Sequence, residues 1–389
     1  MTWPMVKLED LVSITSGFAF KSNLFSESEG VPLIRIRDVV RGVTETFYTG
    51  EYSKEFIINN GDILIGMDGD FNRARWKGGR ALLNQRVCKI KADESNLCDN
   101  YLYHFLPKAL DSINAKTHAV TVKHLSVKGI RDIKIPLPPL TEQKRIAAIL
   151  DKADAIRQKR QQAISLADDF LRSIFLEMFI RAADNWTVKT IEYIADKGKG
   201  GLRTGPFGSH LLHSEFVDSG IPVLGIDNAV ENSFKWGKAR FITEGKYKSL
   251  SRYTVHPGDV LITIMGTCGR CAVVPDDIPT AINTKHLCCI SPDYKKALPE
   301  FLHSYYLFHP MSRQYLAKVT KGAIMDGLNM GLIKTMPFPM VPIKLQEKYV
   351  EIKMAVLSNL DKQHLSESYQ ESLFNSLSQQ LFAGKCLTA

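Results

Sequence analysis

The sequence predicts an α+β protein that contains two copies of one unit, each copy a mixed domain followed by a long helix. Three observations lead to this fold class. Matching segments recur in the two halves of the chain, short β-rich runs alternate with helical patches, and two long helical patterns each carry one apolar face. At 389 residues the chain is long enough for two or three domains, each able to bury a core of its own.

The repeat is visible in three pairs of segments. "GVPLIRIRDV" from Gly30 resembles "GIPVLGIDNA" from Gly220, and "GDILIGMDG" from Gly61 resembles "GDVLITIMG" from Gly258. "LSVKGIRDIKIPLPPLTEQ" from Leu125 aligns without gaps on "LNMGLIKTMPFPMVPIKLQ" from Leu328, an alignment that pairs Gln143 with Gln346. The repeat predicts four parts: a first domain over residues 1–140, a first helix over 141–183, a second domain over 184–343 and a second helix over 344–389.

Both domains contain the same kinds of local pattern. Short apolar runs such as "DILIGM", "VLITIM" and "LCCI" are bounded by glycine and polar residues, as is typical of buried strands. "YLYHFLPKALDSI" and "PEFLHSYYLF" have helical periodicity. Each domain is therefore expected to combine sheets with at least one helix.

The first long helix follows a proline cluster in the stretch "IPLPPLTEQKRIAAILDKADAIRQKR", residues 135–160. Pro136, Pro138 and Pro139 make the approach stiff and extended, and Thr141 is the expected N-cap. Apolar residues then recur at heptad spacing and predict a coiled-coil seam of Ile146, Ile149, Ala153, Ile156, Ala163, Ala167, Phe170 and Ile174.

A second apolar stripe follows the second domain, over residues 344–382. Its predicted seam consists of Val350, Met354, Leu357, Leu360, Leu365, Leu373 and Leu377. Long one-faced helices need a packing partner, and tandem copies related by a pseudo-dyad would supply one. The sequence therefore predicts that the two helices form a long antiparallel two-helix coiled coil between the two domains.

The charge distribution favours a polyanionic partner. Fifty Lys and Arg residues stand against 41 Asp and Glu residues, a formal net charge of +9, and residues 72–89 and 235–252 are basic stretches that each carry a tryptophan. Arg and Lys can neutralise phosphates, Arg can also bind guanine, and Asn or Gln can bind adenine. The predicted DNA contacts are Arg35, Arg37, Arg73, Arg75, Trp76, Lys77, Arg80, Asn84, Gln85, Arg86, Lys235, Trp236, Lys238, Arg240, Lys246, Lys248 and Arg252.

The two copies differ within these candidate contacts. Gly225 and Asp227 stand where the first copy has Arg35 and Arg37. If the domains bind DNA, they are therefore expected to read different base sequences.

Motifs for catalysis are missing from the sequence. It has no Walker phosphate loop, no GxGxxG after a strand, and neither the FxGxG nor the NPPY or DPPY motif of an adenine methylase. Cys268 and Cys271, with Cys288 and Cys289 downstream, are poorly spaced for zinc. No metal, cofactor or catalytic residue is expected. No window is apolar enough for a membrane span, and the seven cysteines lack a disulfide-like spacing, so a cytoplasmic location is expected.

Two alternative functions stay open at this point. A nuclease could use Glu351 and Lys353 in an arrangement that resembles PD…ExK, although both residues lie in a predicted helix. A coiled-coil scaffold could use its basic loops to bind other proteins.

The stretch at 135–160, together with "TVKHLSVKGIRDIKIPLPPL", "DDFLRSIFLEMF" and "SLFNSLSQQLFAG", resembles the specificity subunit of Type I restriction-modification systems. The resemblance implies two target-recognition domains that bind a bipartite, asymmetric double-stranded DNA sequence. It also implies that two adenine-methyltransferase subunits dock on the helices, and that separate restriction subunits cleave DNA, so this chain would catalyse nothing. "MVPIKLQEKYVEI" has lost much of "PLPPLTEQKRI", so the two docking sites are expected to be unequal.

Overall fold

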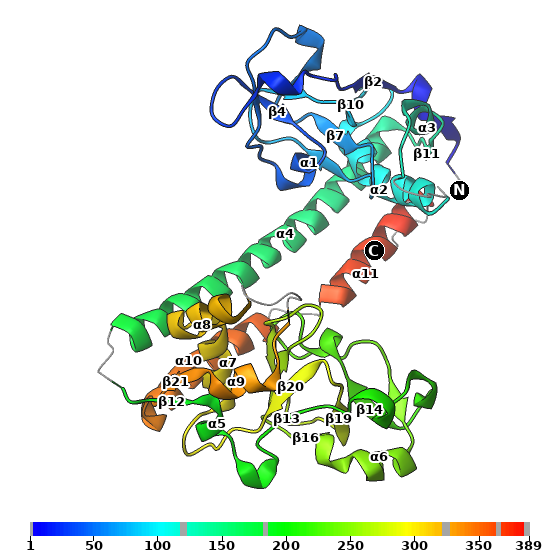
Figure 1. The fold of residues 1–389 in the computed structure, drawn as a ribbon. Coiled ribbons are helices and arrows are strands. Elements are labelled where there is room, and N and C mark those ends of the chain that lie inside the picture. The colour runs from blue at the N-terminus through cyan, green and yellow to red at the C-terminus, as the bar shows by residue number, and fades with distance from the viewer. Residues whose placement is uncertain (1–2, 117–122, 182–185, 321–326, 363–366, 385–389) are drawn as a thin grey trace. The chain divides into compact units, whose positions relative to one another are not determined.

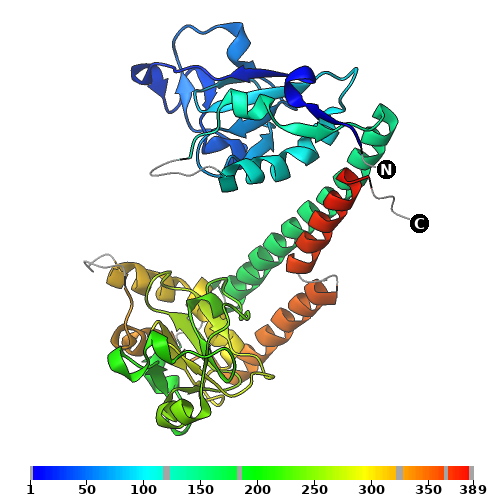
Figure 2. The ribbon, with the colours of Figure 1, turned by 90° about the vertical axis from the view of Figure 1, so that its right-hand side faces the viewer.

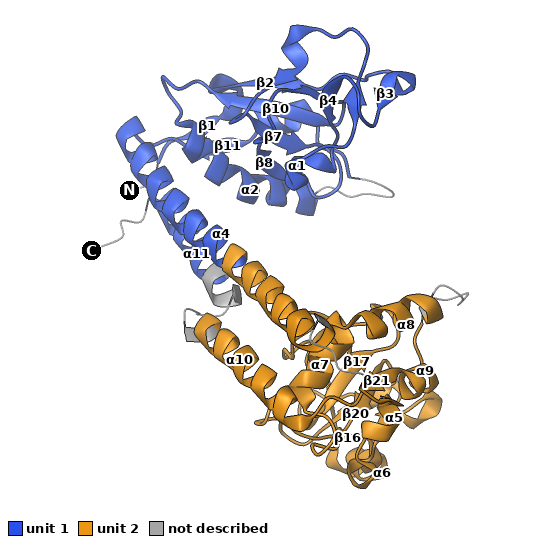
Figure 3. Cartoon of the chain, turned by 90° about the vertical axis from the view of Figure 1, so that its left-hand side faces the viewer, with its two compact units in different colours: residues 1–161, 365–389 blue, residues 162–364 orange. Residues whose placement is uncertain are grey.

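The β-rich runs form sheets and the helical patterns form helices, which confirms the α+β fold class (Figure 1). The structure is a computed structural model, and it describes residues 3–116, 123–181, 186–320, 327–362 and 367–384. Contacts divide the chain into unit 1, residues 1–161 with 365–389, and unit 2, residues 162–364 (Figure 3). The four parts were predicted from the sequence repeat and not from contacts, so the two units do not test their boundaries. These boundaries stay a prediction.

Unit 1 contains two sheets and a two-stranded ribbon. The antiparallel first sheet has the order β2 (Val12–Ser16), β10 (Val87–Ala92), β7 (Ile63–Gly66), β8 (Arg73–Arg75). The second has the order β3 (Phe25–Ser26), β5 (Phe47–Tyr48), β4 (Val31–Ile34), β9 (Ala81–Leu83), β6 (Ile57–Ile58), with β4 and β9 parallel. β1 (Met5–Lys7) pairs with β11 (Lys134–Pro136), and the domain helices are α1 (Asp38–Arg41), α2 (Asp99–Lys116) and α3 (Val127–Arg131).

Unit 2 repeats this plan. Its first sheet has the order β13 (Leu202–Thr204), β20 (Leu287–Ile290), β17 (Val260–Thr263), β18 (Cys271–Val273). The second has the order β15 (Phe241–Ile242), β14 (Ile221–Leu224), β19 (Ala281–Asn283), β16 (Thr254–Val255), with β14 and β19 parallel. β12 (Val188–Thr190) pairs with β21 (Pro337–Pro339), and the helices are α5 (Ile191–Ile194), α6 (Glu244–Leu250), α7 (Pro299–Phe308), α8 (Pro310–Thr320) and α9 (Met330–Thr335). Equivalent strands occupy equivalent places, so the predicted duplication is confirmed.

The sequence of the central strand β7 is apolar at every position because both faces of the strand are covered. Ile63 and Ile65 belong to the core that contains α2, whereas Leu64 belongs to the core between the two sheets. Successive side chains of a strand point to opposite faces, so a strand that is covered on both faces needs apolar residues throughout. In β17 of unit 2, Ile262 and Leu261 divide in the same way between two cores.

A buried glutamine joins each domain to its long helix. Gln143 is 1% exposed; its Oε1 accepts the N–H of Cys98 at 2.8 Å, and its Nε2 donates to the carbonyls of Asn96 at 3.0 Å and Pro138 at 2.8 Å. Gln346 in unit 2 is 0% exposed and makes the same three bonds, with the N–H of Leu298 at 2.9 Å and the carbonyls of Lys296 at 3.0 Å and Val341 at 2.8 Å. The gapless alignment of these two glutamines therefore has a structural reason.

The first long helix forms as predicted, with a different start. α4 (Leu140–Leu176) has 37 residues, about 55 Å at 1.5 Å per residue, and continues into a π-helical turn (Glu177–Arg181). Thr141 is not the N-cap, because the Pro139 carbonyl already accepts the N–H of Gln143 at 3.0 Å. The second pattern forms α10 (Ile343–Lys362) and α11 (Glu367–Phe382), and the predicted seam residue Leu365 lies outside the described residues.

The helices pair antiparallel within each unit. In unit 1, α11 lies beside the first half of α4 (Figure 2), and Phe374 of α11 lies 5.6 Å beneath the guanidinium of Arg157 of α4. Further along α11, Phe382 packs on Tyr101 with ring centroids 5.0 Å apart. In unit 2, Tyr349 near the start of α10 packs on Phe175 near the end of α4, with ring centroids 5.3 Å apart.

Two residues of the predicted α4 seam, both at the same heptad position, are exposed. Ile156 and Phe170 are 63% and 48% exposed, whereas Leu150 and Leu171 are buried. The predicted seam runs from Ile146 to Ile149 and on to Ala153, a step of three residues and then a step of four. The seam in the structure runs from Ile146 to Leu150 and on to Ala153, a step of four residues and then a step of three. Apolar neighbours occur at both choices, so the sequence alone could not fix the phase. Ile149, Ala153, Ala163, Ala167 and Ile174 are half-buried.

The second seam shows the same kind of error. Met354 and Leu373 are 49% and 53% exposed. Their neighbours face inward instead. Lys353 binds a carboxylate of α7. Phe374 packs on an aromatic ring of unit 1. Val350, Leu357, Leu360 and Leu377 are half-buried.

Candidate nucleic-acid interface

Four strands of unit 1 end at one edge of the domain. The parallel strands β4 and β9 finish side by side, with Ile34 paired to Leu83. β2 and β7 finish on either side of the start of β10. The segments that follow these strand ends therefore gather here, and we call residues 17–20, 35–37, 67–72 and 84–86 loop edge 1.

Asn84 joins three of these segments. Its N–H donates to the Ile34 carbonyl at 3.3 Å, Phe18 forms a parallel β-bridge with it, and its Oδ1 accepts the N–H of Gln85 at 2.9 Å. With only 7% of its surface exposed, Asn84 has a structural role in joining these segments, and its predicted base contact stays a prediction. Gln85 beside it is exposed.

Arg35, Arg37, Gln85 and Arg86 follow the paired ends of β4 and β9 on loop edge 1. Arg35 and Arg37 line an open polar cavity of about 590 Å³. Arg86 is 64% exposed in its side chain, and its Nη1 lies 2.8 Å from Asp68 Oδ2. The backbone of Arg86 has φ of 69°, in the left-handed region that a non-glycine residue adopts only when neighbours enforce it.

Arg73 and Arg75, two of the predicted DNA contacts, are half-buried and have partners within the domain. The Arg73 guanidinium lies 3.6 Å from the ring centroid of Tyr103, and burial lowers the pKa of Arg73. The Nη1 of Arg75 lies 2.7 Å from Asp99 Oδ2 and donates to the carbonyl of Gly61 at 2.8 Å. Both arginines project from β8 towards α2, so they fix the helix to the sheet.

Trp76 is also structural. It is 2% exposed, and its indole N–H donates to the Gly79 carbonyl at 2.6 Å. Its backbone bonds to Gly61 and Asp62 place it at the start of β7, which is the opposite end of that strand from loop edge 1. Lys77 and Arg80 follow it and are exposed. The basic stretch 72–89 is therefore divided among two ends of the domain and its interior.

Unit 2 has an equivalent edge, formed by the ends of β13, β14, β17 and β19. We call residues 205–208, 225–228, 264–270 and 284–286, with the segment 235–240 that folds over them, loop edge 2. The N–H of Lys235 donates to the Asn228 carbonyl at 3.2 Å, and the N–H of Lys238 donates to Asp227 Oδ2 at 2.5 Å. These bonds bring Lys235, Trp236 and Lys238 to the edge, where Trp236 is 58% exposed.

Two basic residues of loop edge 2 escaped sequence analysis. Lys285 and His286 occupy the places of Gln85 and Arg86, so the repeat itself contained the signal that could have identified them. The pKa of His286 is lowered, first by partial burial and then by the positive charges of Lys285 and Arg240. Arg240 also pairs with Asp227 at 2.5 Å.

The remaining predicted contacts of unit 2 lie on α6 and in the turn after it. Lys246 pairs with Glu215 at 2.6 Å, and Arg252 lies 4.6 Å over the ring of Tyr253. Lys248 is exposed. These residues keep an outward charge, but they belong to a different segment from loop edge 2.

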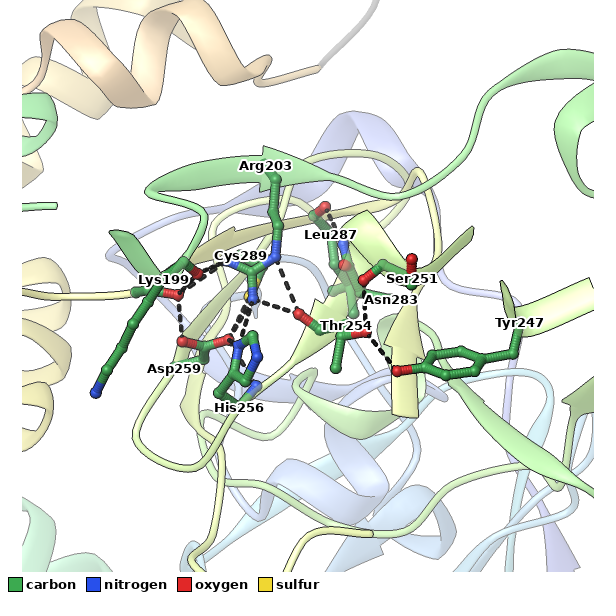
Figure 4. Close-up of polar contacts among 11 residues, drawn as sticks. Lys199, Arg203, Tyr247, Ser251, Thr254, His256, Asp259, Asn283, Leu287 and Cys289 are labelled. Atoms are coloured by element: carbon green, nitrogen blue, oxygen red, sulfur yellow. Dashed lines mark hydrogen bonds and ion pairs between the residues drawn. The ribbon is translucent and has the colours of Figure 1, made fainter. Parts of the chain in front are cut away.

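A buried ion pair at the other end of the strands was also missed. Figure 4 shows the Arg203 guanidinium directed at Asp259, with 2.5 Å between Nη2 and Oδ2. Nη2 also donates to the Thr254 carbonyl at 2.6 Å, and Nη1 donates to Ser291 Oγ at 2.8 Å. The side chains of Arg203 and Asp259 are only 8% and 2% exposed, so each charge depends on the other. Burial and the Asp259 carboxylate raise the pKa of the neighbouring Cys289 thiol.

Unit 1 satisfies the equivalent aspartate by another route. Asp62 lies 3.6 Å from Lys89 Nζ, which also donates to the Ile57 carbonyl at 3.1 Å. Lys89 is on β10 and is paired with Thr15 on β2, whereas in unit 2 the cation is Arg203, on the strand equivalent to β2. The cation has moved to the neighbouring strand while the aspartate has stayed.

One of the two residues of the nuclease alternative, Lys353, serves the structure of unit 2. Lys353 is 5% exposed, and its Nζ binds the Glu300 carboxylate and donates to His303 Nδ1 at 3.1 Å. His303 in turn donates from Nε2 to the Asn232 carbonyl at 2.8 Å. Glu351 is exposed on another face of α10. Lys353 is therefore occupied within the fold.

Two cysteines of the described residues, Cys271 and Cys288, behave as small apolar residues. Cys271 and Cys288 are fully buried on opposite sides of β17, and burial raises the pKa of Cys288 to about 12. Within the described ranges, no group of three or more His, Cys, Asp or Glu side chains could hold a metal ion. The helices of these ranges are also too short or too polar to cross a membrane.

Comparison with known proteins identifies the family. The family model described as Type I restriction modification DNA specificity domain matches residues 1–166 and 184–370. The chain is 32% identical over 396 residues to the specificity subunit of the Type I restriction enzyme EcoBI from Escherichia coli, which covers 93% of this chain and 81% of that protein. The EcoKI specificity subunit from Escherichia coli K12 is 21% identical over 435 residues, covering 95% of this chain and 89% of that protein.

A solved structure has the same fold. The crystal structure of the Type I restriction-modification S subunit from M. genitalium matches with a TM-score of 0.60 at 16% identity, covering 98% of this chain and 96% of that one. The two family matches place one specificity domain in each half of the chain, as the duplication predicts. Specificity subunits are the non-catalytic recognition components of these systems. The chain belongs to the family of Type I restriction-modification specificity subunits.

Proposed function

We propose that this chain binds a bipartite, asymmetric double-stranded DNA sequence, and that loop edge 1 and loop edge 2 each read one half-site. One observation carries the proposal: the two edges are built on the same strand ends but present different side chains. Arg35, Arg37, Gln85 and Arg86 of loop edge 1 correspond to Gly225, Asp227, Lys285 and His286 of loop edge 2. A common scaffold with different donors and acceptors is suited to reading two different half-sites.

The chemistry of each edge supports this division of roles. In unit 1, the guanidinium groups of Arg35 and Arg37 can bind guanine, and the exposed carboxamide of Gln85 can bind adenine. In unit 2, Lys235 and Lys238 flank the exposed Trp236 and can neutralise phosphates. We assign phosphate contacts at the periphery to the exposed residues Lys77, Arg80, Lys248 and Arg252.

The helices supply the spacer and the docking surface. α4 is about 55 Å long, which exceeds the 34–36 Å of one turn of B-DNA, and we propose that its length sets the gap between half-sites. Each unit also exposes apolar residues on its helices: Ile156 and Leu373 in unit 1, and Leu166, Phe170 and Met354 in unit 2. We propose that one adenine-methyltransferase subunit covers each set, and that restriction subunits join this complex.

The experiment begins by finding the target. Co-expression with the neighbouring subunits, followed by mapping of methylated adenines in the host genome, gives the two half-sites. The complex is then titrated with three duplexes: the full target, one with half-site 1 scrambled and one with half-site 2 scrambled. Scrambling of either half-site is expected to weaken binding, and rising salt should weaken binding to every duplex, because phosphate contacts release counterions.

Variants test which edge reads which half. The double variant Arg35→Ala with Arg37→Ala should lose discrimination at one half-site only. Its matched control is Lys128→Ala with Arg131→Ala, which removes the same charge from exposed residues of α3, near the turn that precedes β2. Equal loss in the control would show that charge alone matters and would remove loop edge 1 as the reading surface. A complex that binds all three duplexes equally would refute the proposed function.

A further inference from the structure

Phe18 is an apolar side chain held at the centre of loop edge 1. Its ring is 49% exposed, whereas the nearby Phe20 is 7% exposed. The backbone of Phe18 is fixed on both sides, because its N–H donates to the Leu83 carbonyl at 3.0 Å and its carbonyl accepts the N–H of Gln85 at 2.8 Å. The exposed ring is therefore presented from a rigid support rather than from a free loop.

The packing around the ring leaves it little freedom. The ring centroids of Phe20 and Phe56 lie 5.2 Å and 5.1 Å from that of Phe18. The loop can approach this closely only because residue 17 is glycine, since a Cβ there would lie 2.0 Å from the Asn84 carbonyl oxygen. One side of the ring is thus fixed by aromatic contacts, so a ligand on its other side costs little additional ordering.

The residues near Phe18 indicate which group of the DNA its ring contacts. Gln85 bonds to the backbone of Phe18, and Arg35 follows the end of β4 on the other side of Asn84, so both offer polar groups for guanine and adenine on the same loop edge. The apolar group of a base edge in the major groove is the 5-methyl group of thymine, and a phenylalanine side chain is suited to contact it. A half-site that contains a methylatable adenine contains an A·T pair, so such a methyl group is present in the target.

Building on the proposed function, we propose that Phe18 contacts the 5-methyl group of one thymine in the half-site bound by loop edge 1 and so determines specificity there. The support comes from a rigid apolar contact placed among polar base-binding groups.

Unit 2 also has an exposed phenylalanine after the equivalent glycine. Phe207 is 47% exposed in the equivalent segment of loop edge 2. Residue 205 is again glycine, and a Cβ there would lie 2.0 Å from the Asn283 carbonyl oxygen. The phenylalanine stands one position later because proline follows the glycine in this copy. The two edges thus differ in their polar groups and share an exposed aromatic ring.

The test removes single methyl groups from the DNA. Each thymine of the half-site is replaced in turn by deoxyuridine, which keeps base pairing and loses only the 5-methyl group. The complex with wild-type chain should bind one of these duplexes about fourfold more weakly, the effect of about 0.8 kcal/mol for one buried methyl-sized group. The complex with Phe18→Ala should bind the thymine and uracil duplexes equally at that position.

Two further variants make the result interpretable. Phe18→Leu keeps an apolar side chain against Phe20 and Phe56, and it should retain part of the uracil penalty. Met5→Ala truncates another exposed apolar residue, 57% exposed on β1, and should leave the penalty at about fourfold. Thermal melting of each variant checks that the fold is intact.

The outcomes separate this inference from the proposed function. If the wild-type complex discriminates half-sites but is indifferent to uracil at every thymine, the Phe18 contact is refuted and the proposed function stands. The same holds if Phe18→Ala keeps the full uracil penalty. A complex without any half-site discrimination refutes both.

Discussion

Replacement of Gln143 by leucine is expected to destabilise unit 1 strongly. Leucine has a similar size but leaves the N–H of Cys98 and the carbonyls of Asn96 and Pro138 without their partner. A buried polar group that loses its partner costs about 1–3 kcal/mol, so three such groups give a loss of roughly 3–9 kcal/mol in the free energy of unfolding. This loss is a large share of the roughly 5–15 kcal/mol that stabilises a typical protein.

The assay must resolve the two units, because a chain of this size need not unfold in one step. Urea unfolding gives the change in stability, and hydrogen exchange locates it. In Gln143→Leu, exchange should accelerate in residues 96–106 of unit 1, and Gln346→Leu should accelerate exchange around residues 296–306 of unit 2. The matched control is Gln161→Leu, which replaces an exposed glutamine of the same helix and should change stability by less than about 0.5 kcal/mol.

A free energy of unfolding for Gln143→Leu within about 1 kcal/mol of the wild-type value would refute this expectation. It is also refuted if the exchange rates of both units change together, since the three hydrogen bonds of Gln143 lie entirely within unit 1.

Three other substitutions probe unit 2. Arg203→Ala should cost about 3–5 kcal/mol in urea unfolding, because it leaves the Asp259 carboxylate buried without its cation, and Arg203→Lys should restore part of the loss. Burial, followed by the charge of Lys353, lowers the pKa of His303 to about 3, so the folded protein holds it neutral while the unfolded chain binds a proton below about pH 6.5. The free energy of unfolding should therefore fall as the pH is lowered from about 6.5 towards 3, by up to about 1.4 kcal/mol per pH unit. Urea titrations at pH 6.5 and 5 should show a smaller fall for His303→Gln than for the wild type. Phe170→Ser should change unfolding by less than about 0.5 kcal/mol, since the ring is exposed, while reducing co-purification of a methyltransferase subunit.

The fold was predictable because the sequence contains a repeat, which allows each half of the chain to be compared with the other. Two weak strand patterns that recur in the same order support each other, and the match of Gln143 with Gln346 marked a junction that the structure shows twice. The phase of the helix seam was not predictable in the same way. At Ile149 with Leu150, and again at Phe170 with Leu171, both neighbours are apolar, and only the surface that receives the helix selects one of them.

The candidate interface was predictable only in part, because charge was taken as a sign of exposure. Arg73 and Arg75 occur in a stretch without acids, yet Asp99 and Tyr103 on α2 receive them from about 25 residues further along the chain. Local sequence does not reveal such distant partners. Arg35 and Arg37 follow the end of β4 rather than lying within a strand, and their DNA contacts stay a prediction.

The ion pairs at the strand starts explain how the two loop edges could diverge without loss of the fold. Asp62 and Asp259 each precede a central strand and accept a backbone N–H from the same tight turn, at 2.9 and 2.8 Å. Their cations come from different strands, Lys89 in one unit and Arg203 in the other, so what persisted between the copies is the interaction and not the cationic residue. This anchor lies at the start of the central strand, and the loop edge lies at its end. Substitutions in a loop edge therefore act on one end of the sheet, while the other end keeps the sheet in register.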